Sequence, residues 1–287
     1  MQAHHIDLFD KATLTESYRE NGFVLVNGTM SPQELTEIDH DLKKINRGDY
    51  DTDAIEPVDW PLDDDRLLGR HMYIGMPHVL SDTIARFVNH PKLVSVLDHI
   101  VGAFVPFWDG GYKCIQTMFV SKGPNGKGSP WHQDEHPIPT RDRSLTGVWI
   151  PTTDVEVENG CLWIVPDSHK SGVIYDRFDH NNPDVDHKAE ARGFDDSGAI
   201  PLPMKAGDVL FFSGYLLHSS KPNRRTGTYR PSLTLHYTSA TTILSWHGEW
   251  NYTGGIPIRG KDPYAENGYS VPAPWANTAE ESNRLKV

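Results

Sequence analysis

A short motif with metal-binding potential lies near the middle of the chain, at Trp131-His132-Gln133-Asp134. Side chains alternate along an extended strand with a period of two, so an imidazole and a carboxylate two residues apart share one face. His132 and Asp134 are therefore predicted to chelate one ion. The triplet alone is weak evidence, because the chain has 15 histidines and short motifs often match by chance.

A third ligand has to come from a distant part of the chain. His218 follows the hydrophobic stretch Val209 to Phe212 and is well placed for this in a β-roll. Two imidazoles and one carboxylate form a facial triad that leaves positions open on an octahedral ion, as Fe(II) oxygenases require. Zinc would usually need fewer open positions. The predicted metal ligands are therefore His132, Asp134 and His218.

Other histidines near these motifs are weaker candidates. His136 would continue the strand face of His132 and is a minor alternative ligand, although Pro137 is expected to end that strand. His169 is expected in a turn, and His236 in the core or lining a pocket. Iron binding needs neither of the last two.

Arg230 stands twelve residues beyond His218, where the predicted strand Ser232 to Tyr237 begins. One hairpin is predicted to carry both residues. A guanidinium pairs bidentately with a carboxylate, so Arg230 can anchor a dicarboxylate whose other end chelates the metal. 2-Oxoglutarate has this shape. Arg224 and Arg225, in the intervening turn, are expected to be surface residues.

Composition limits the classes of partner. The chain has 287 residues, a formal net charge of −12, 37% hydrophobic and 23% charged residues, which is typical of a soluble globular protein. The negative charge argues against nucleic acid or anionic membranes as partners and favours a small molecule. Two cysteines, Cys114 and Cys161, make no disulfide framework. No signal peptide or apolar run of membrane-spanning length is evident, so we expect a cytoplasmic protein whose oligomeric state is open.

The first third of the chain is predicted to be helical. Ser31-Pro32-Gln33-Glu34 reads as a capping box with proline at the first helical position, after a short buried strand at Gly22 to Val26. Four apolar residues then recur at helical spacing: Leu35, Ile38, Leu42 and Ile45. A second helical region is expected over residues 81–101, broken before Pro91.

After residue 102 the pattern becomes all-β. Short runs rich in β-branched and aromatic residues alternate with turn residues. The predicted strands are Cys114 to Val120, Thr146 to Ile150, Cys161 to Val165, Val209 to Phe212 and Ser232 to Tyr237. Helices outside an antiparallel core indicate one domain over residues 1–287, a double-stranded β-helix of jelly-roll, cupin-like type. Helices over about 15–102 would pack on a β core over about 110–240, with a tail at 251–287 that is either draped or partly disordered.

Taken together, these motifs resemble the phytanoyl-CoA dioxygenase (PhyH) family of Fe(II)/2-oxoglutarate-dependent oxygenases. The resemblance covers about residues 15–240. It rests on Asn21 to Val26, Trp131 to Asp134, Glu158 to Leu162, Pro166 to Gly172, and the stretch from His218 to Arg230. The family usually has glycine where Asp167 stands, and its arginine often follows the distal histidine one residue sooner.

The resemblance implies further site residues and a reaction. Gln116, Met118 and Trp149 would line the metal and co-substrate pocket, although a methionine or tryptophan in an apolar strand is as often simple core. Gln116 needs a polar partner inside an apolar run, which a bound carboxylate or keto group would supply. Ser220 would add a hydroxyl to the co-substrate carboxylate.

The implied cofactors are Fe(II), 2-oxoglutarate and O2. The implied reaction hydroxylates an unactivated C–H bond of a small molecule and releases succinate and CO2. Because Asp134 keeps the carboxylate that related halogenases lack, hydroxylation is favoured over halogenation. A metal-dependent cupin-type isomerase or hydrolase, or a non-catalytic binding module on the same fold, are the alternatives.

The substrate itself is not encoded in these motifs, since loops around the iron centre set specificity. Six aromatic and basic residues are expected to flank the mouth of the site: Trp108, Tyr112, Arg141, Arg143, Trp246 and Trp250. The acidic balance of the chain slightly disfavours a highly anionic CoA ester.

Overall fold

Helices occupy the N-terminal third of the structure, a computed structural model that describes residues 5–6, 11–244, 255–263 and 275–277. The α-helices of this part are α1 (Lys11–Asn21), α2 (Pro32–Arg47), α3 (Asp82–Val88) and α4 (Pro91–Ile100), and its short 3-10 turns are η1 (Asp65–Gly69) and η2 (Pro77–Val79). A third 3-10 turn, η3 (Val157–Asn159), lies later in the chain.

The start of α2 confirms the predicted capping box. Ser31 Oγ accepts from the Glu34 N–H at 3.3 Å, and the Glu34 carboxylate accepts from the Ser31 N–H at 2.7 Å. Pro91 separates α3 from α4, as predicted. The helix α1 was not predicted from the sequence. Among its described side chains only Leu14 and Tyr18 are buried, and two apolar residues do not define a helical period.

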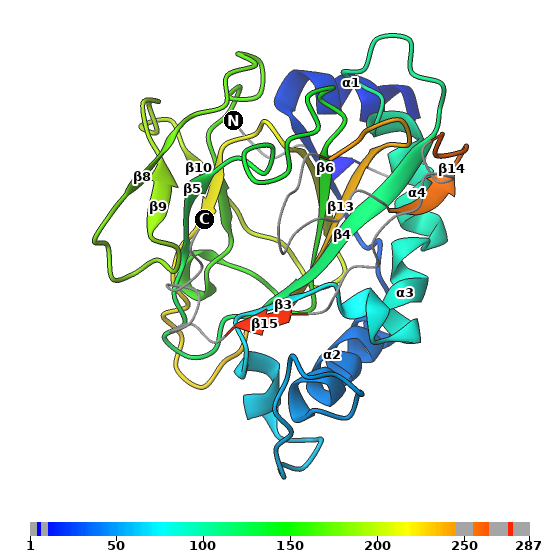
Figure 1. Cartoon of the computed structure of the whole chain (residues 1–287). Helices are drawn as coiled ribbons and strands as arrows, with labels where there is room; N and C mark the ends of the chain where they lie inside the picture. The colour runs from blue at the N-terminus through cyan, green and yellow to red at the C-terminus, as the bar shows by residue number, and fades with distance from the viewer. Residues whose placement is uncertain (1–4, 7–10, 245–254, 264–274, 278–287) are drawn as a thin grey trace.

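A large, mainly antiparallel sheet forms the centre of the molecule (Figure 1). Its strands are neighbours in the order β1 (His5–Ile6), β2 (Phe23–Val26), β11 (Val209–Ser213), β6 (Thr146–Pro151), β13 (Ser232–Ser239), β4 (Tyr112–Val120), β3 (Tyr73–Gly75) and β15 (Trp275–Asn277), and β14 (Ile256–Arg259) also pairs with β4.

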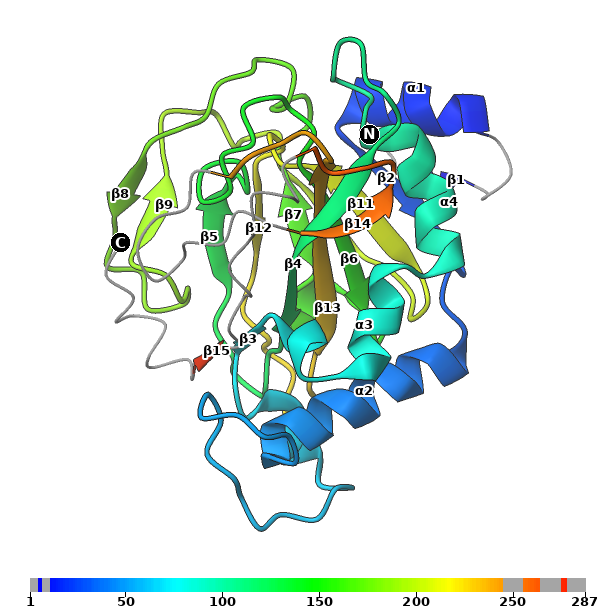
Figure 2. The same ribbon diagram turned by 45° about the vertical axis from the view of Figure 1, so that its right-hand side comes forward.

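A smaller antiparallel sheet faces it. Its strand order is β10 (Ile200–Leu202), β7 (Leu162–Ile164), β12 (His218–Ser220) and β5 (Ser129–His132). A separate hairpin of β8 (Arg177–Asp179) and β9 (Ala189–Ala191) lies beside β5 (Figures 1 and 2). Figure 2 shows the helices on one side of the large sheet and the small sheet on the other. The predicted double-stranded β-helix is confirmed, and so is each of the five strands predicted after residue 102.

One apolar cluster lies between the helices and the large sheet, and another lies between the two sheets. Along β11, Val209 and Phe211 pack toward the helices, whereas Leu210 and Phe212 pack between the sheets, because alternate side chains leave opposite faces of a strand. The cluster between the sheets draws on β2, β6, β7, β10 and β11. The remaining space between the sheets, beside β4, β5, β12 and β13, is left for polar side chains.

Part of the C-terminal tail belongs to the fold. β14 pairs with β4, and β15 pairs with β3, so these two described segments of the tail extend the large sheet. Both cysteines are buried and free. Among the described residues, no helix is long and apolar enough to cross a membrane.

Candidate metal centre

The three predicted metal ligands meet between the two sheets. His132, the last residue of β5, pairs directly with His218, the first residue of β12. Asp134 lies just beyond β5 in a turn whose Ile138 N–H donates to the Asp134 carbonyl at 2.9 Å. The prediction that one extended strand carries both His132 and Asp134 is wrong, because the strand ends at His132. One ligand atom from each residue still lies within 4.8 Å of the others.

Hydrogen bonds select which nitrogen of each imidazole is free. His132 Nδ1 lies 2.8 Å from the Pro130 carbonyl oxygen, and His218 Nδ1 lies 2.9 Å from that of Leu216. A carbonyl only accepts, so both Nδ1 atoms carry the proton and donate it. Each Nε2 therefore keeps its lone pair and faces the Asp134 carboxylate, which is the tautomer that a metal ligand needs.

Distances and charge states suit a divalent cation at this point. The Nε2 atoms of His132 and His218 lie 3.5 and 3.6 Å from Asp134 Oδ1; three ligands at about 2.1 Å from one ion in a facial arrangement are about 3 Å apart. Burial, with the His218 charge next, lowers the pKa of His132 to about 3. Burial alone would raise the pKa of Asp134, but the neighbouring imidazoles hold it well below its usual range. At neutral pH these two groups are thus in their metal-binding forms.

A fourth side chain orients the carboxylate. His236, on β13 of the large sheet, places Nε2 3.0 Å from Asp134 Oδ2. It is buried, and its Nδ1 has no partner in the described part of the chain, so Nε2 carries a proton that it donates to Asp134. The expectation of a core or pocket-lining residue is correct for its position. The hydrogen bond from His236 to the metal-ligand candidate Asp134 was not predicted from the sequence.

Arg230 lies in the protein interior. Its side chain is 1% exposed, its Nη1 donates to Ser232 Oγ at 3.1 Å, and its guanidinium carbon lies 5.4 Å from the centre of the Trp149 ring. Its Nε is buried without a partner among the described residues. Burial lowers the pKa of Arg230 to about 10, so it stays charged at neutral pH. The prediction of one hairpin carrying His218 and Arg230 is wrong, because β12 belongs to the small sheet and β13 to the large one.

Lys122, which the sequence reasoning missed, lies beside Arg230. The two backbones form an antiparallel bridge, and Lys122 is also 1% exposed. Its Nζ donates to Ser220 Oγ and to the Lys221 carbonyl, both at 2.7 Å. Burial, and then the charge of Arg230, lowers the pKa of Lys122 well below its usual value. Neither cation has an ion pair with a carboxylate of the described chain.

Ser220 completes this group of hydrogen-bond donors. Its Oγ accepts from Lys122 Nζ and from the Ser129 N–H, the latter at 3.2 Å. A hydroxyl has two acceptor lone pairs and one proton. With both lone pairs engaged, Ser220 can offer its O–H to an incoming acceptor. Lys122, Ser220 and Arg230 present buried hydrogen-bond donors of the kind that suit an anion, and we refer to the three residues as the anion site.

The remaining predicted residues face the same interior. On β4 the pairing with β13 shifts by one residue between His236 and Tyr237. From this bulge onward, Gln116 and Met118 share the inner face with His236, and both are half-buried. The Gln116 amide makes no hydrogen bond within the described part of the chain. Contact of Gln116, Met118, Trp149 and Ser220 with a co-substrate stays a prediction.

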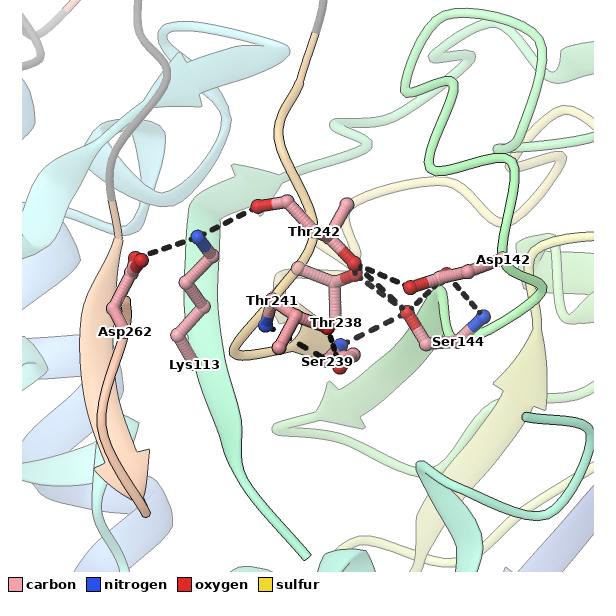
Figure 3. A network of polar contacts seen from close by, with 8 residues as sticks. All are labelled: Lys113, Asp142, Ser144, Thr238, Ser239, Thr241, Thr242 and Asp262. Carbon is pink, nitrogen blue, oxygen red and sulfur yellow. Dashed lines mark hydrogen bonds and ion pairs between the residues drawn. The ribbon is translucent and has the colours of Figure 1, made fainter. Parts of the chain in front are cut away.

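A polar network braces the loop that follows the metal turn (Figure 3). Asp142 accepts from the hydroxyls of Ser144 and Thr242, both at 2.6 Å. The Thr242 carbonyl accepts from Lys113 Nζ at 2.8 Å, and Lys113 forms a fully buried ion pair with Asp262 at 2.6 Å. The network ties residues 142–144 to the end of β13 and to the tail, so this end of the roll is held in place.

Several residues considered from the sequence lie away from the metal centre. His136 adds no atom to the ligand cluster of the described chain. His169 lies in a turn, as predicted, near the Arg19 carbonyl at 3.0 Å. Arg224 and Arg225 form ion pairs with Asp184 and Glu156 and are partly exposed, as expected.

Of the six expected mouth residues, Tyr112 and Trp108 lie elsewhere, whereas a place at the mouth stays a prediction for Arg141 and Arg143. Tyr112 packs on the helical side of the large sheet, where its hydroxyl donates to Asp98 at 2.7 Å, and Trp108 packs on Tyr112. The Arg143 guanidinium binds the His169 carbonyl at 2.6 Å. Arg141 is exposed, and its backbone N–H donates to the Glu135 carboxylate at 2.7 Å. Trp246 and Trp250 lie outside the described residues.

Comparisons with known proteins agree with this geometry. The model of the family "Phytanoyl-CoA dioxygenase (PhyH)" matches residues 18–232. Phytanoyl-CoA dioxygenase domain-containing protein 1 of Rattus norvegicus is 29% identical over 59% of this chain and 57% of its own length. Phytanoyl-CoA dioxygenase 1 of Oryza sativa subsp. japonica is 36% identical over 42% of this chain and 43% of its own length. The chain thus spans about half the length of these relatives.

A solved structure shares the fold. The epimerase SnoN in complex with Fe3+, alpha ketoglutarate and nogalamycin RO superposes with a TM-score of 0.61 at 21% identity, covering 88% of this chain and 96% of that one. At this identity the likeness establishes the architecture.

Proposed function

The chain belongs to the phytanoyl-CoA dioxygenase (PhyH) family, and from this premise we propose that it is an Fe(II)- and 2-oxoglutarate-dependent dioxygenase that hydroxylates a C–H bond of a small molecule. His132, Asp134 and His218 hold the iron in this proposal. A cytoplasmic location belongs to the proposal as well and rests on the sequence alone.

The residues fit the metal. Two Nε2 lone pairs and one carboxylate oxygen converge from β5, its turn and β12, while backbone carbonyls hold each Nδ1 proton. His236 holds the second oxygen of Asp134, which leaves Oδ1 as the metal-facing atom. Three protein ligands leave room for a bidentate co-substrate and dioxygen, as in Fe(II) oxygenases with this triad.

The observation that carries the proposal is the anion site formed by Arg230, Lys122 and Ser220. Two buried cations side by side are costly unless an anion joins them. Arg230 has a buried, unpaired Nε, and Ser220 has an uncommitted hydroxyl proton. A carboxylate accepts all of these donors. A dicarboxylate such as 2-oxoglutarate can place one end here and the other at the triad, with Gln116, Met118 and Trp149 beside it.

The chain's contribution to the reaction is positioning and exclusion of water. When bound, iron with 2-oxoglutarate and dioxygen supplies the oxidising chemistry, which converts 2-oxoglutarate to succinate and CO2 while a substrate hydrogen is replaced by hydroxyl. Tight packing of Trp149 and Phe212 beside the polar centre keeps water from the inner side. No side chain has to act as a general base.

One alternative outcome follows from the fold. A structural neighbour is an epimerase, so the same centre can support a reaction whose product carries no new hydroxyl. A cupin-type isomerase or hydrolase, or a binding module, would have no use for the buried cation pair. Product mass separates these outcomes, since hydroxylation adds one oxygen and epimerisation adds none.

Succinate formation tests the proposal. Purified protein is supplied with Fe(II), ascorbate and 2-oxoglutarate, with and without a panel of candidate substrates, beside the variants His132→Ala and Arg230→Ala. We expect succinate with the native protein, more of it with a true substrate, and background levels with both variants. Equal succinate from the native protein and His132→Ala would contradict the proposed metal site.

A further inference from the structure

Gln133, the residue between the first two metal-ligand candidates, is a glutamine whose amide is engaged at both ends. The residue is 1% exposed. Its Nε2 donates to the Val173 carbonyl at 2.9 Å and to the Tyr215 carbonyl at 2.8 Å, and its Oε1 accepts from the Tyr175 N–H at 2.9 Å. A glutamine amide has two N–H donors, so both are used. Gln133 therefore joins the metal turn to two segments that are distant in the sequence.

The ladder between β5 and β12 reaches only as far as the ligands. His132 and His218 form the last pair at this end, and the register shifts within β12 on the other side of that pair. The regular pairing of β12 with β7 does not relate the two imidazoles to each other, because β7 carries no ligand. Hydrogen bonds outside the ladder therefore set how the chain approaches His218.

Two hydrogen bonds from the metal turn hold the chain just before His218. The Gln133 amide donates to the Tyr215 carbonyl, and a backbone N–H of the same turn donates to the Gly214 carbonyl at 3.0 Å. The next carbonyl, that of Leu216, accepts from His218 Nδ1 at 2.9 Å. Because each peptide unit is planar, a fixed Tyr215 carbonyl restricts the direction of the Leu216 carbonyl, and with it the orientation of the His218 ring.

The other two bonds of the amide reach the loop between β7 and β8. Val173 is 46% exposed, so this loop lies at the surface, and Tyr175 packs on Phe194 with ring centroids 5.3 Å apart. Gln133 is thus a joint between a surface loop and the segment that leads to His218.

We propose that Gln133 is a positioning residue that sets the place of His218 Nε2 relative to Asp134, so that the affinity and geometry of the metal site depend on its amide. The proposal rests on the proposed function, since it takes His132, Asp134 and His218 as the metal ligands. Gln133 acts through these residues and not on the ion, because both ends of its amide are engaged with backbone groups. A group that orients a metal ligand typically changes metal affinity about 10- to 100-fold when it is replaced.

Co(II) binding tests the proposal without turnover. Co(II) is titrated into metal-free protein and followed by its visible d–d spectrum, which reports the ligand geometry as well as the affinity. Gln133→Met keeps the length of the side chain and removes all three hydrogen bonds, whereas Gln133→Glu keeps the acceptor for the Tyr175 N–H. The matched control is Gln33→Met, at an exposed position of α2. Leu42→Ala lowers stability from the apolar cluster between the helices and the large sheet.

We expect Gln133→Met to bind Co(II) about 10- to 100-fold more weakly than the native protein and with an altered spectrum. Gln133→Glu should lose affinity as well, because it cannot donate to both carbonyls. Gln33→Met and Leu42→Ala should keep the native affinity and spectrum. Native affinity in Gln133→Met, or an equal loss in Leu42→Ala, overturns the proposal. If circular dichroism shows that Gln133→Met does not fold, Gln133→Glu decides.

A double-mutant cycle shows through which ligand Gln133 acts. His218→Ala removes the imidazole that Gln133 is proposed to place, so in that background Gln133→Met should cost less than about threefold in Co(II) affinity. A general loosening of the fold would cost the same factor in both backgrounds. The full loss in the His218→Ala background overturns the proposal.

Amide hydrogen exchange tests the joint in the native chain. Zn(II) bound at the triad should slow exchange of the Tyr175 N–H, which donates to Gln133 Oε1, because coupling between two sites is reciprocal. The Ser197 N–H, which donates to Asp195 within its own turn, should keep its rate. A Tyr175 exchange rate that the metal leaves unchanged overturns the proposal, whether or not the variants fold.

The two proposals fail separately in this design. A native protein that binds no Co(II), or that binds it no better than Asp134→Ala does, counts against the proposed function. One Co(II) per chain that depends on Asp134 and not on Gln133 counts against the role of Gln133 alone.

Discussion

Replacing Lys122 by methionine removes one cation from the anion site while keeping the length of the buried side chain. Lys122 Nζ donates to Ser220 Oγ and to the Lys221 carbonyl and lies in the same buried group as Arg230. In the proposed complex its remaining proton and its charge act on the far carboxylate of 2-oxoglutarate. The substitution leaves the triad and its hydrogen bonds unchanged.

The expected loss follows from one charge-assisted hydrogen bond. Such a bond contributes about 1.5–3 kcal/mol, and a tenfold change in Kd corresponds to about 1.4 kcal/mol. Lys122→Met should therefore weaken 2-oxoglutarate binding about 10- to 150-fold. Arg230 still supplies the main contact, so binding is reduced rather than abolished.

Lys122 should also make the binding of 2-oxoglutarate pH dependent. Burial and then Arg230 lower the pKa of Lys122 in the free protein, whereas a bound carboxylate raises it again. The complex then holds more protons than the free protein, so affinity falls as pH rises above the lowered pKa of Lys122. By the same linkage, the free folded protein holds fewer protons than the unfolded chain, so its stability rises with pH from that lowered pKa to about 10.4.

Isothermal titration of 2-oxoglutarate into protein loaded with Ni(II), which prevents turnover, measures both effects over a series of pH values. The matched control is Lys221→Met, which removes a neighbouring lysine from an exposed position. We expect the control to behave as the native protein and Lys122→Met to lose both affinity and the alkaline slope. A Kd for Lys122→Met within threefold of native at every pH would refute the reasoning.

Three further predictions concern the groups around the site. His236→Phe should lower metal affinity about 10- to 100-fold by freeing the second oxygen of Asp134, which Co(II) titration measures; unchanged affinity would show that the hydrogen bond has no such effect. Arg230→Lys keeps the charge but loses the planar fork, so 2-oxoglutarate binding by calorimetry should weaken while metal affinity stays native; a parallel loss of both would point to misfolding instead. Asp262→Leu removes the carboxylate of the fully buried ion pair with Lys113 and should cost about 3–5 kcal/mol in urea unfolding, whereas the double variant Lys113→Met/Asp262→Leu should recover most of it; no recovery would mean that the pair is not the source of the loss.

Local sequence patterns predict the scaffold well here because they depend on neighbouring residues. The cap at Ser31, the break before Pro91 and the period-two strands all follow from short-range backbone and packing rules. The helix α1 escapes the same rules because its buried face is too narrow. The position of Asp167, where the family usually has glycine, has a φ of 62°, and aspartate is among the residues that tolerate it.

The residues that were not predicted owe their positions to contacts between segments that are far apart in the sequence. Lys122 lies in the turn-like sequence Ser121-Lys122-Gly123-Pro124, and its bridge to Arg230 and its hydrogen bond to Ser220 come from distant parts of the chain. His236 contacts Asp134 because β13 and the turn after β5 come from opposite sheets. Tyr112 and Gln116 have the same parity along β4 and would share a face, but the bulge between them sends Tyr112 to the helical side.

The β8–β9 hairpin has a similar limit. Its strands are three residues each and lie in a polar insertion without strong periodicity. Their packing beside β5 is a property of the folded chain and could not be inferred from spacing.

In the proposed complex, one ion and 2-oxoglutarate bind together between the triad and Arg230. The most direct measurement is the visible spectrum of metal-free protein after anaerobic addition of Fe(II) and then 2-oxoglutarate, repeated with Asp134→Ala and Arg230→Met. We expect a charge-transfer band in the native protein that saturates at one iron per chain, disappears in Asp134→Ala, and in Arg230→Met requires far more 2-oxoglutarate. A native protein without the band, or an equal band in Asp134→Ala, would contradict this joint binding.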